Sequence, residues 1–172
     1  LAQIELEREN WKEAERHLVE ALKISSEFED ADSIAGILFL LGKTAEEQKD
    51  LETAKEYFKE SLEIYKKNDN LIEKSKPLHH LGRILHAQGK IAEAEKYFKT
   101  SIGIKIKYGE NQGKGPELLH LGKLASAQGR FEEAEAYYKE ALNMAIKSND
   151  INGQISCLVL LGTLNDQQGD WK

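Results

Sequence analysis

Apolar side chains recur at the spacing of an α-helix between residues 51 and 67. Apolar and small residues lie three or four positions apart and therefore share one helical face; they are Leu51, Ala54, Tyr57, Phe58, Ser61, Leu62 and Tyr65. Acidic residues gather at the start of this segment and lysines at its end, where each sign of charge stabilises the helix dipole. The pattern predicts an amphipathic helix that packs its apolar face against a neighbour.

The same pattern returns every forty residues. The pair Leu-Gly occurs at 41–42, 81–82, 121–122 and 161–162. Other positions keep this period, including a leucine that we expect in the core and a large apolar residue that opens the amphipathic helix; they are Leu38, Leu78, Leu118 and Leu158, and Trp11, Leu51, Ile91, Phe131 and Trp171. Repetition of this length predicts stacked pairs of helices, in which the amphipathic segment is the second helix of each pair.

Glycine holds two further positions of the repeat. Gly42 and its equivalents fall in the middle of the first helix, where glycine costs about 1 kcal/mol relative to alanine. We therefore expect the backbone of a neighbouring helix to come close there. Gly89, Gly129 and Gly169 follow the first helices, and we expect them to end these helices in the left-handed conformation.

Composition excludes several classes of protein. The 172 residues carry a net charge of −6, so we expect neither nucleic acid nor a membrane surface as a partner. Cys157 is the single cysteine, which excludes an internal disulfide framework and favours a reducing compartment, the cytoplasm. The longest apolar runs are far too short to span a bilayer. Because Leu1 falls within a first helix by the repeat register, we expect a piece of a larger protein.

The repeated residues give the chain a resemblance to the tetratricopeptide repeat (TPR) family. The family's Leu-Gly…Ala…Phe/Tyr…Ala signature falls on Leu81, Gly82, Ala94, Phe98 and Ser101, and likewise in the neighbouring units. The forty-residue period is similar to that of Pins/LGN-type scaffolds and kinesin light chains. The resemblance implies an all-α fold, a right-handed α-solenoid of antiparallel helix pairs forming a TPR-like superhelix.

The register also divides the chain. We expect residues 1–172 to form a single repeat array. Residues 30–69, 70–109 and 110–149 are full repeats, and residues 1–29 and 150–172 are partial ones. Because stacked repeats need capping ends and no polar cap is visible, we expect further repeats to flank the array.

In the TPR family, variable positions of the first helices line a concave groove in which ligands lie. The resemblance implies such a ligand-binding groove here; its candidate residues are Phe39, Lys43, Glu46, Lys76, His79, Arg83, His86, Leu119, Lys123, Ser126, Val159 and Asp166. Lys43, Arg83 and Lys123 form a column of cations among them. Two interpretations have equal weight: the cations pair with acids on neighbouring helices, or they bind an acidic or phosphorylated segment of a ligand.

Three histidines, His79, His80 and His86, lie within eight residues and raise the question of metal binding or catalysis. His79 and His86 are two turns apart, about 10 Å along a helix, and Arg83 between them would repel a divalent cation. No nucleophile lies in a pattern with a base, and no carboxylates are paired as acid–base chemistry requires. We expect no metal, no cofactor and no enzymatic activity.

The function that the resemblance implies is that of a scaffold or adaptor. Such a protein–protein interaction module binds a peptide or protein segment in its groove. Two alternatives stay open. A sensor or autoinhibitory repeat domain would belong to a larger signalling ATPase or transcription regulator, and a structural module would self-associate through its terminal repeats.

Overall fold

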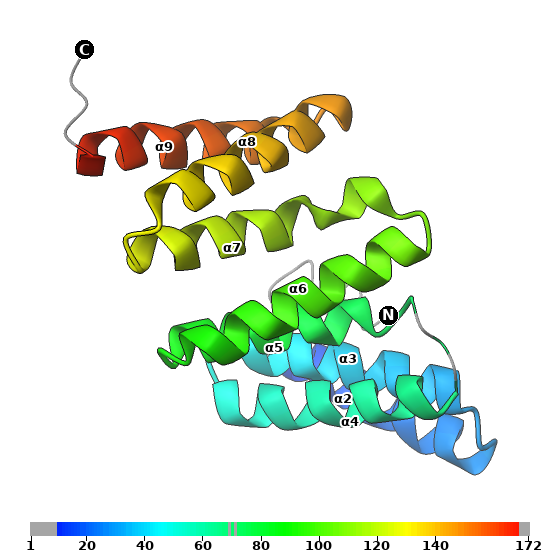
Figure 1. Cartoon of the computed structure of the whole chain (residues 1–172). Helices are drawn as coiled ribbons and strands as arrows, with labels where there is room; N and C mark the ends of the chain where they lie inside the picture. Colours follow the sequence, from blue (N-terminus) through cyan, green and yellow to red (C-terminus); the bar gives the residue numbers. More distant parts are fainter. Residues whose placement is uncertain (1–9, 69, 71, 169–172) are drawn as a thin grey trace. The chain divides into compact units, whose positions relative to one another are not determined.

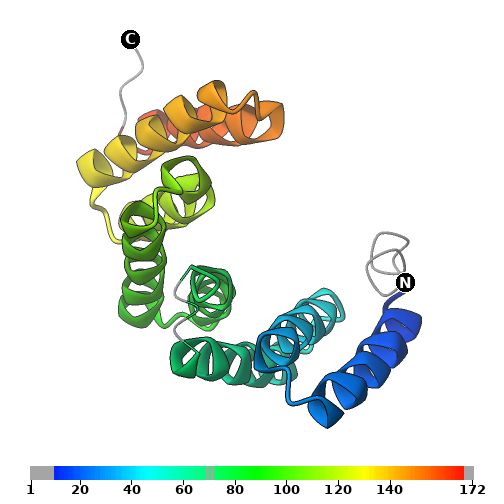
Figure 2. The same cartoon turned by 90° about the vertical axis from the view of Figure 1, so that its right-hand side faces the viewer.

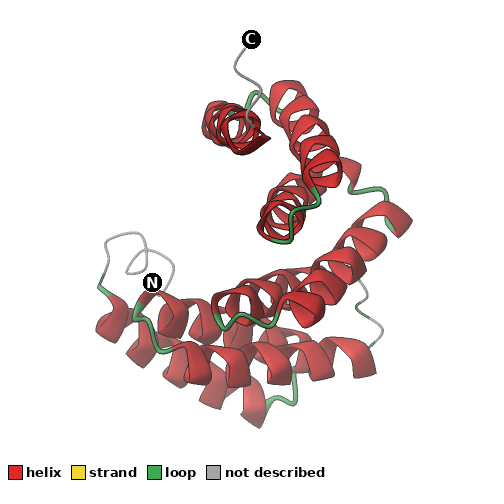
Figure 3. Ribbon diagram, turned by 60° about the vertical axis from the view of Figure 1, so that its left-hand side comes forward, coloured by secondary structure: helices red, strands yellow, loops and turns green. Residues whose placement is uncertain are grey.

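The computed structural model describes residues 10–68, 70 and 72–168, and the regular structure of that part is all helical (Figures 1 and 3). The α-helices are α2 (Trp11–Glu27), α3 (Ala31–Glu47), α4 (Leu51–Lys67), α5 (Ser75–Ala87), α6 (Ile91–Lys107), α7 (Gly115–Ala127), α8 (Phe131–Lys147) and α9 (Ile151–Gln168). A short 3-10 helix, η1 (Asn111–Lys114), precedes α7. The all-α class predicted from the sequence is confirmed.

Tight turns join consecutive helices, and each described turn of this kind holds a residue with positive φ. The φ angles lie between 53° and 79°; the residues are Glu29, Lys49, Gly89, Gly109, Gly129 and Asn149. Gly89 and Gly129 confirm the prediction for the ends of first helices, whereas Gly169 lies outside the described residues. The left-handed residue lets the chain reverse and bond back to the helix, as where the Arg130 N–H donates to the Ala125 carbonyl oxygen at 2.9 Å.

The chain divides into two compact units. The first unit ends at Ile84 and holds α2, α3, α4 and most of α5. The second unit begins at Leu85 and holds the last turn of α5 followed by α6, α7, α8 and α9. Within the first unit α2 packs on α3 and α3 on α4, and within the second α7 packs on α8 and α8 on α9 (Figure 2). Because the connections are short, packed neighbours run antiparallel.

Gly42 and Gly122, each in the middle of a first helix, admit an aromatic ring from the following helix. A Cβ atom at Gly42 would lie 2.6 Å from Cε1 of Phe58, and one at Gly122 would lie 2.3 Å from Cε1 of Tyr138. Both rings are buried. The expectation of a close backbone is therefore wrong for these two glycines, because the second helix fills the gap with a large side chain.

The interior of the second unit consists of small clusters that join successive helices. One cluster joins the last turn of α5 to α6 and α7 through Leu85, Ala94, Phe98, Leu121 and Leu124. Another joins α7, α8 and α9 through Ala125, Ala134, Tyr138 and Leu164. On the first helix α7, Leu121, Leu124 and Ala125 therefore lie on the buried side.

The junction between α6 and α7 buries a charge. The Glu117 side chain is fully buried, and its Oε1 accepts hydrogen bonds from Ser101 Oγ at 2.8 Å and Lys105 Nζ at 2.6 Å. Lys105 also donates to the Gly113 carbonyl oxygen at 2.6 Å. A buried carboxylate needs such donors because an uncompensated charge in the interior is strongly destabilising. The pair therefore ties the loop before α7 to α6.

The outer face of α9 exposes apolar side chains. Leu158 is 57% exposed, although its counterparts Leu38 and Leu118 are only 2% and 3% exposed. The expectation that Leu158 lies in the core is therefore wrong. Leu38 and Leu118 lie on first helices that α4 and α8 cover, and no helix of the described residues covers α9 in the same way.

Candidate ligand-binding face

The candidate residues come from first helices and are divided between the two units. The first unit holds Phe39, Lys43, Glu46, Lys76, His79 and Arg83, and the second holds His86, Leu119, Lys123, Ser126, Val159 and Asp166. Within each helix they lie three, four or seven positions apart, which places them along one side of it.

Glu46 is the centre of a polar cluster that joins α3 to α5 in the first unit. Its carboxylate lies 2.6 Å from Nδ1 of His80 and 3.4 Å from a guanidinium nitrogen of Arg83. The side chains of Glu46 and His80 are only 11% and 14% exposed, whereas that of Arg83 is 42% exposed. The cation predicted at position 83 therefore has an acidic partner on the neighbouring helix.

The surroundings of Glu46 and His80 set their protonation. Burial raises the pKa of the Glu46 carboxyl, but the hydrogen bond and charge of His80, with Arg83 and His79, leave this pKa below its ordinary value. Burial lowers the pKa of His80, and its hydrogen bond to Glu46 only partly offsets the effect. At neutral pH the pair therefore consists of an ionised Glu46 and a neutral His80 that donates its Nδ1–H.

Aromatic rings hold His80 between the helices. The imidazole stacks on the Phe58 ring with centroids 4.8 Å apart and meets the Phe39 ring edge-on at 5.3 Å. Phe39 also contacts Phe58 at 5.7 Å, and His79 meets His80 edge-on at 5.4 Å. Phe39 and His79 are half-buried, so part of each ring is used in packing within the unit.

A related cluster occurs in the second unit. His120 stacks on Phe98 with centroids 5.0 Å apart and nearly parallel planes, and His86 meets His120 edge-on at 6.4 Å. Burial, followed by the charge of Lys123, lowers the pKa of His86. Lys123 is exposed and forms no ion pair with any residue that the structure describes. At the position equivalent to Glu46 this cluster therefore has the imidazole of His86 in place of a carboxylate.

The remaining candidate residues differ in exposure. Lys76 is exposed and pairs with Glu73 at 2.6 Å. Lys43 is half-buried and, among residues 10–68, 70 and 72–168, has no acidic partner. Of the three cations in the predicted column, Arg83 is paired with Glu46, whereas Lys43 and Lys123 have no acidic partner among the described residues.

On α7 and α9, Leu119 is half-buried against the interior of the second unit, and Ser126 is also half-buried. Val159 is 58% exposed, and Asp166 is exposed as well. Val159 is therefore the apolar side chain of the candidate set with the largest surface open to a ligand.

The stacking of His80 and His120 on phenylalanine rings was not predicted from the sequence, although the repeat pattern contains a signal for it. Their position in the repeat is held by histidine in two repeats and by leucine in two. The residue 22 positions earlier, on the preceding second helix, changes together with it. The pairs are Leu18 and Leu40, Phe58 and His80, Phe98 and His120, and Tyr138 and Leu160. Histidine occurs where the preceding second helix offers a phenylalanine ring, which is the partner that the structure shows.

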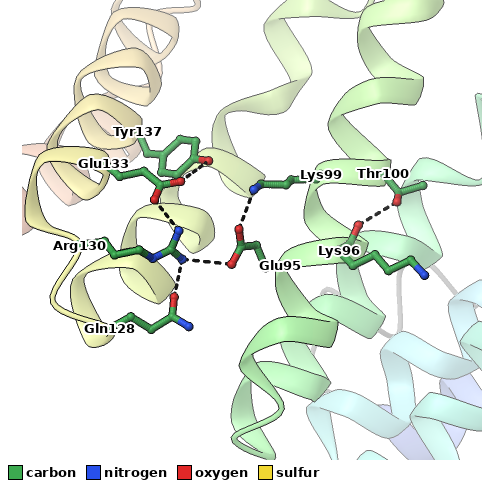
Figure 4. A network of polar contacts seen from close by, with 8 residues as sticks. All are labelled: Glu95, Lys96, Lys99, Thr100, Gln128, Arg130, Glu133 and Tyr137. Atoms are coloured by element: carbon green, nitrogen blue, oxygen red, sulfur yellow. Dashed lines mark hydrogen bonds and ion pairs between the residues drawn. The ribbon is translucent and has the colours of Figure 1, made fainter.

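A second polar network joins the second helices α6 and α8 (Figure 4). A guanidinium nitrogen of Arg130 lies 3.0 Å from the Glu95 carboxylate, and another contacts Glu133. Lys99 donates to Glu95 at 2.6 Å, and the Tyr137 hydroxyl donates to Glu133 at 3.1 Å. Both Arg130 and Lys99 have acidic partners here, so this network joins the two helices.

Within the described ranges, no three side chains of His, Cys, Asp or Glu come together as a metal site requires. The Cys157 thiol lines an apolar cavity of about 80 Å³ between α7, α8 and α9. Burial, with Asp150 nearby, raises its pKa, so the thiol stays protonated and unreactive at neutral pH. None of the helices described here combines the length and apolar character that crossing a membrane requires.

A family model described as "MalT-like TPR region" matches residues 1–172. No curated protein sequence matches the chain.

Several solved structures share the fold. BtubC (BKLC) from P. vanneervenii is 21% identical with a TM-score of 0.86, and the match covers 99% of this chain and 71% of that one. Nearly identical TPR-like repeats from a Podosopora anserina protein assigned as a kinesin light chain are 17% identical with a TM-score of 0.75, covering 99% and 85%. A Rap protein complexed with Competence and Sporulation Factor is 17% identical with a TM-score of 0.75, covering 95% and 51%. At these identities the likeness shows the fold alone, and the TPR-like α-solenoid class is confirmed.

Proposed function

This chain belongs to the family of MalT-like TPR regions, and from that premise we propose that it binds a segment of another protein along its first helices. TPR repeat domains generally bind proteins and are typically not catalytic by themselves. The observation that most supports the proposal is that Lys43 and Lys123 lack acidic partners among the described residues. They lie in the variable column of the first helices, whereas Lys99 and Arg130 on the other network are fully paired.

The pairing pattern favours an acidic or phosphorylated ligand. A carboxylate or phosphate that approaches Lys43 or Lys123 gains a charge-assisted hydrogen bond without breaking an internal pair. At Arg83 the same group would compete with Glu46, which lies 3.4 Å away. The half-buried Leu119 and the exposed Val159 add apolar surface for the rest of the segment. We place this interaction in the cytoplasm, the reducing compartment that a single cysteine favours.

An affinity pull-down from a lysate of the source organism tests the proposal. The parent chain and the K43A/R83A/K123A variant serve as baits in parallel. The chain offers a matched control, K59A/K99A/K139A, which removes three exposed lysines that are also forty residues apart but lie on the second helices. The expected result is a partner that the parent and the control recover and the first variant loses. Equal recovery on all three baits would overturn the role of the first-helix cations.

A second candidate function is that of a repeat domain within a larger regulator. The family description and the likeness to a Rap protein complexed with Competence and Sporulation Factor favour it. In this case the ligand changes the activity of a neighbouring domain and does not assemble a scaffold. The sequence of the parent gene distinguishes the two functions, because only a regulator encodes a catalytic or DNA-binding domain beside the repeats.

Self-association is the third candidate. The apolar face of α9 supports it, with Ile151, Ile155 and Leu158 between 55% and 62% exposed. Sedimentation velocity over a range of concentrations tests it. A single species at all concentrations would exclude it.

A further inference from the structure

The second unit contains a cavity of about 80 Å³ where α7, α8 and α9 meet. Its floor consists of buried side chains: Ala141, Ala145 and Cys157 are between 1% and 7% exposed. The lining also includes the exposed residues Ser148 and Asp150, which mark where the cavity opens to solvent. Because one water needs only about 10–15 Å³ of such space, the cavity can hold several waters or, in their place, one phenol-sized ring.

The equivalent place in the first unit is filled by the side chain of Tyr65, which stands two periods before Ala145. This side chain is buried, and its hydroxyl oxygen lies 3.7 Å from a Cβ atom built at Gly36. Gly36 in turn is the counterpart of Pro116, which lines the cavity. The phenol ring of the first unit therefore extends between the two positions that border the cavity in the second.

The junction between α6 and α7 is also filled, in this case by an ion pair. Lys105 is the counterpart of Ala145, and Glu117 is the counterpart of Cys157. The side chains of Lys105 and Glu117 are only 14% and 0% exposed and meet at 2.6 Å. The cavity is therefore the space that remains where a repeat has two small side chains in place of a ring or an ion pair.

The cavity borders the candidate ligand-binding face. Leu119, a candidate residue on α7, belongs to its lining. Lys123 follows Leu119 by four residues, about 6 Å along the helix, and therefore lies on the same side of α7. Lys123 is exposed and forms no ion pair within the part of the chain that the structure describes. A ring in the cavity and a carboxylate at Lys123 can thus come from neighbouring residues of one ligand.

On the basis of the groove-binding function proposed above, we propose that this cavity is the subsite for one tyrosine side chain of an acidic protein segment. The ring takes the place that Tyr65 holds in the first unit, and an aromatic side chain in such a pocket is a strong anchor. The phenol hydroxyl remains at the opening, where the Asp150 carboxylate and the Ser148 hydroxyl can accept its hydrogen bond. A carboxylate beside the tyrosine gains a charge-assisted hydrogen bond from Lys123.

Met144 offers a direct test, because it lines the cavity and is the single methionine of the chain. In protein labelled with carbon-13 at the methionine methyl group, a ring that enters the cavity shifts the one methyl NMR signal. The probe is acetyl-Glu-Tyr-Glu-amide, and the control probe is acetyl-Glu-Ala-Glu-amide. The expected result is a saturable shift with the tyrosine probe only. Equal shifts with both probes, or none with either, would overturn the subsite.

A variant taken from the chain's own repeats closes the cavity. A145Y installs the tyrosine of position 65, and we expect it to fold, because the cavity supplies the space for the ring. It should weaken binding of the tyrosine probe at least roughly tenfold. The matched control I146Y adds the same ring at the next position, which is 54% exposed, and should bind the probe as the parent does. Should A145Y not fold, C157L decides: it narrows the cavity from α9, and undiminished affinity contradicts the proposal.

The small phenol p-cresol, which is the tyrosine side chain without its backbone, tests whether the occupant belongs to a protein segment. It should bind more weakly than acetyl-Glu-Tyr-Glu-amide, because it lacks the carboxylates that reach Lys123. Equal affinity of the two probes would overturn the assignment to a protein segment.

The lysate partner separates failure of this inference from failure of the proposed function. If K43A/R83A/K123A loses the partner but A145Y retains it with unchanged affinity, only the tyrosine subsite is wrong. If all variants retain the partner equally, the binding face itself is wrong.

Discussion

Gly42 and Gly122 set how closely a second helix packs against its first helix. The rings of Phe58 and Tyr138 occupy the place of the missing side chain at 2.6 and 2.3 Å from a Cβ atom built there. At Gly162 such an atom meets nothing within 4 Å. The repeated Leu-Gly pair is therefore explained at two positions by a ring that requires the space.

Alanine at Gly122 tests this role against a control in the same column. G122A gains about 1 kcal/mol in helix propensity but forces a methyl group into the Tyr138 ring, at a cost of about 1–3 kcal/mol in a packed core. We expect a net loss of stability in urea unfolding. G162A has the gain without the clash and should be neutral or more stable. A G122A variant as stable as G162A would contradict the account.

Protonation of His80 makes the free energy of unfolding depend on pH over a defined range. Its pKa in the folded protein lies below the ordinary 6.5, so the unfolded chain takes up the proton first. The free energy of unfolding should therefore fall as the pH decreases through 6.5, and level off once folded His80 is protonated. His86 acts in the same direction, and the lowered pKa of Glu46 adds a separate loss below pH 4.5.

Urea unfolding at about pH 7.5 and about pH 5.5 measures this window in the parent and in H80L, which carries the leucine of positions 40 and 160. The difference in the free energy of unfolding between the two pH values should be smaller in H80L. An equal difference in both proteins would show that His80 does not titrate as described.

At the scale of elements, the α6–α7 junction differs from the other junctions between repeats. Lys105 and Glu117 are a buried ion pair, whereas the equivalent pairs are uncharged: Ser25 and Ile37, Tyr65 and Pro77, and Ala145 and Cys157. Among the junctions compared, the buried ion pair is therefore specific to the one between α6 and α7.

Breaking the pair should cost much more than replacing it. K105M leaves the Glu117 charge in the interior, and such losses are about 3–5 kcal/mol. The double variant K105M/E117L removes both charges and should recover most of the stability measured by urea unfolding. As a comparison, R130M breaks the pairs of a side chain that is 37% exposed and should cost only about 0–1 kcal/mol. A double variant no more stable than K105M would contradict this explanation.

The sequence predicts the helices better than the contacts between them. The forty-residue period predicts paired helices, and Gly89 and Gly129 predict two of the left-handed turns. Lys49 adopts the same conformation without glycine, because the turn geometry is imposed by the helices on either side. The burial of Glu117 could not be predicted, since it depends on Lys105 reaching across the junction from another helix.

For the candidate site too, the sequence predicts the positions of the residues better than their contacts. The variable columns predict which residues lie on the first helices, and the structure places them there. The partners of these residues depend on side-chain geometry across helices, so the sequence alone does not predict that Arg83 lies 3.4 Å from Glu46. Lys123 belongs to the same column and has no such partner among the described residues.

At the scale of the whole molecule, the chain is a MalT-like TPR region whose repeats share a fold and differ in the chemistry of their side chains. The columns that make the interior are nearly constant, as with Ala14, Ala54, Ala94 and Ala134, all fully buried. The columns on the variable side of the first helices change from repeat to repeat. The first set holds the fold together, and under the function proposed above the second set selects the partner.

The most direct test of this claim is lysine acetylation footprinting of the chain with and without the partner recovered from lysate, quantified by mass spectrometry. The account predicts that the partner slows acetylation of Lys43 and Lys123 several-fold and leaves Lys59, Lys99 and Lys139 unchanged. Protection of the second-helix lysines, with Lys43 and Lys123 still reactive, would contradict it and place the partner on the second helices.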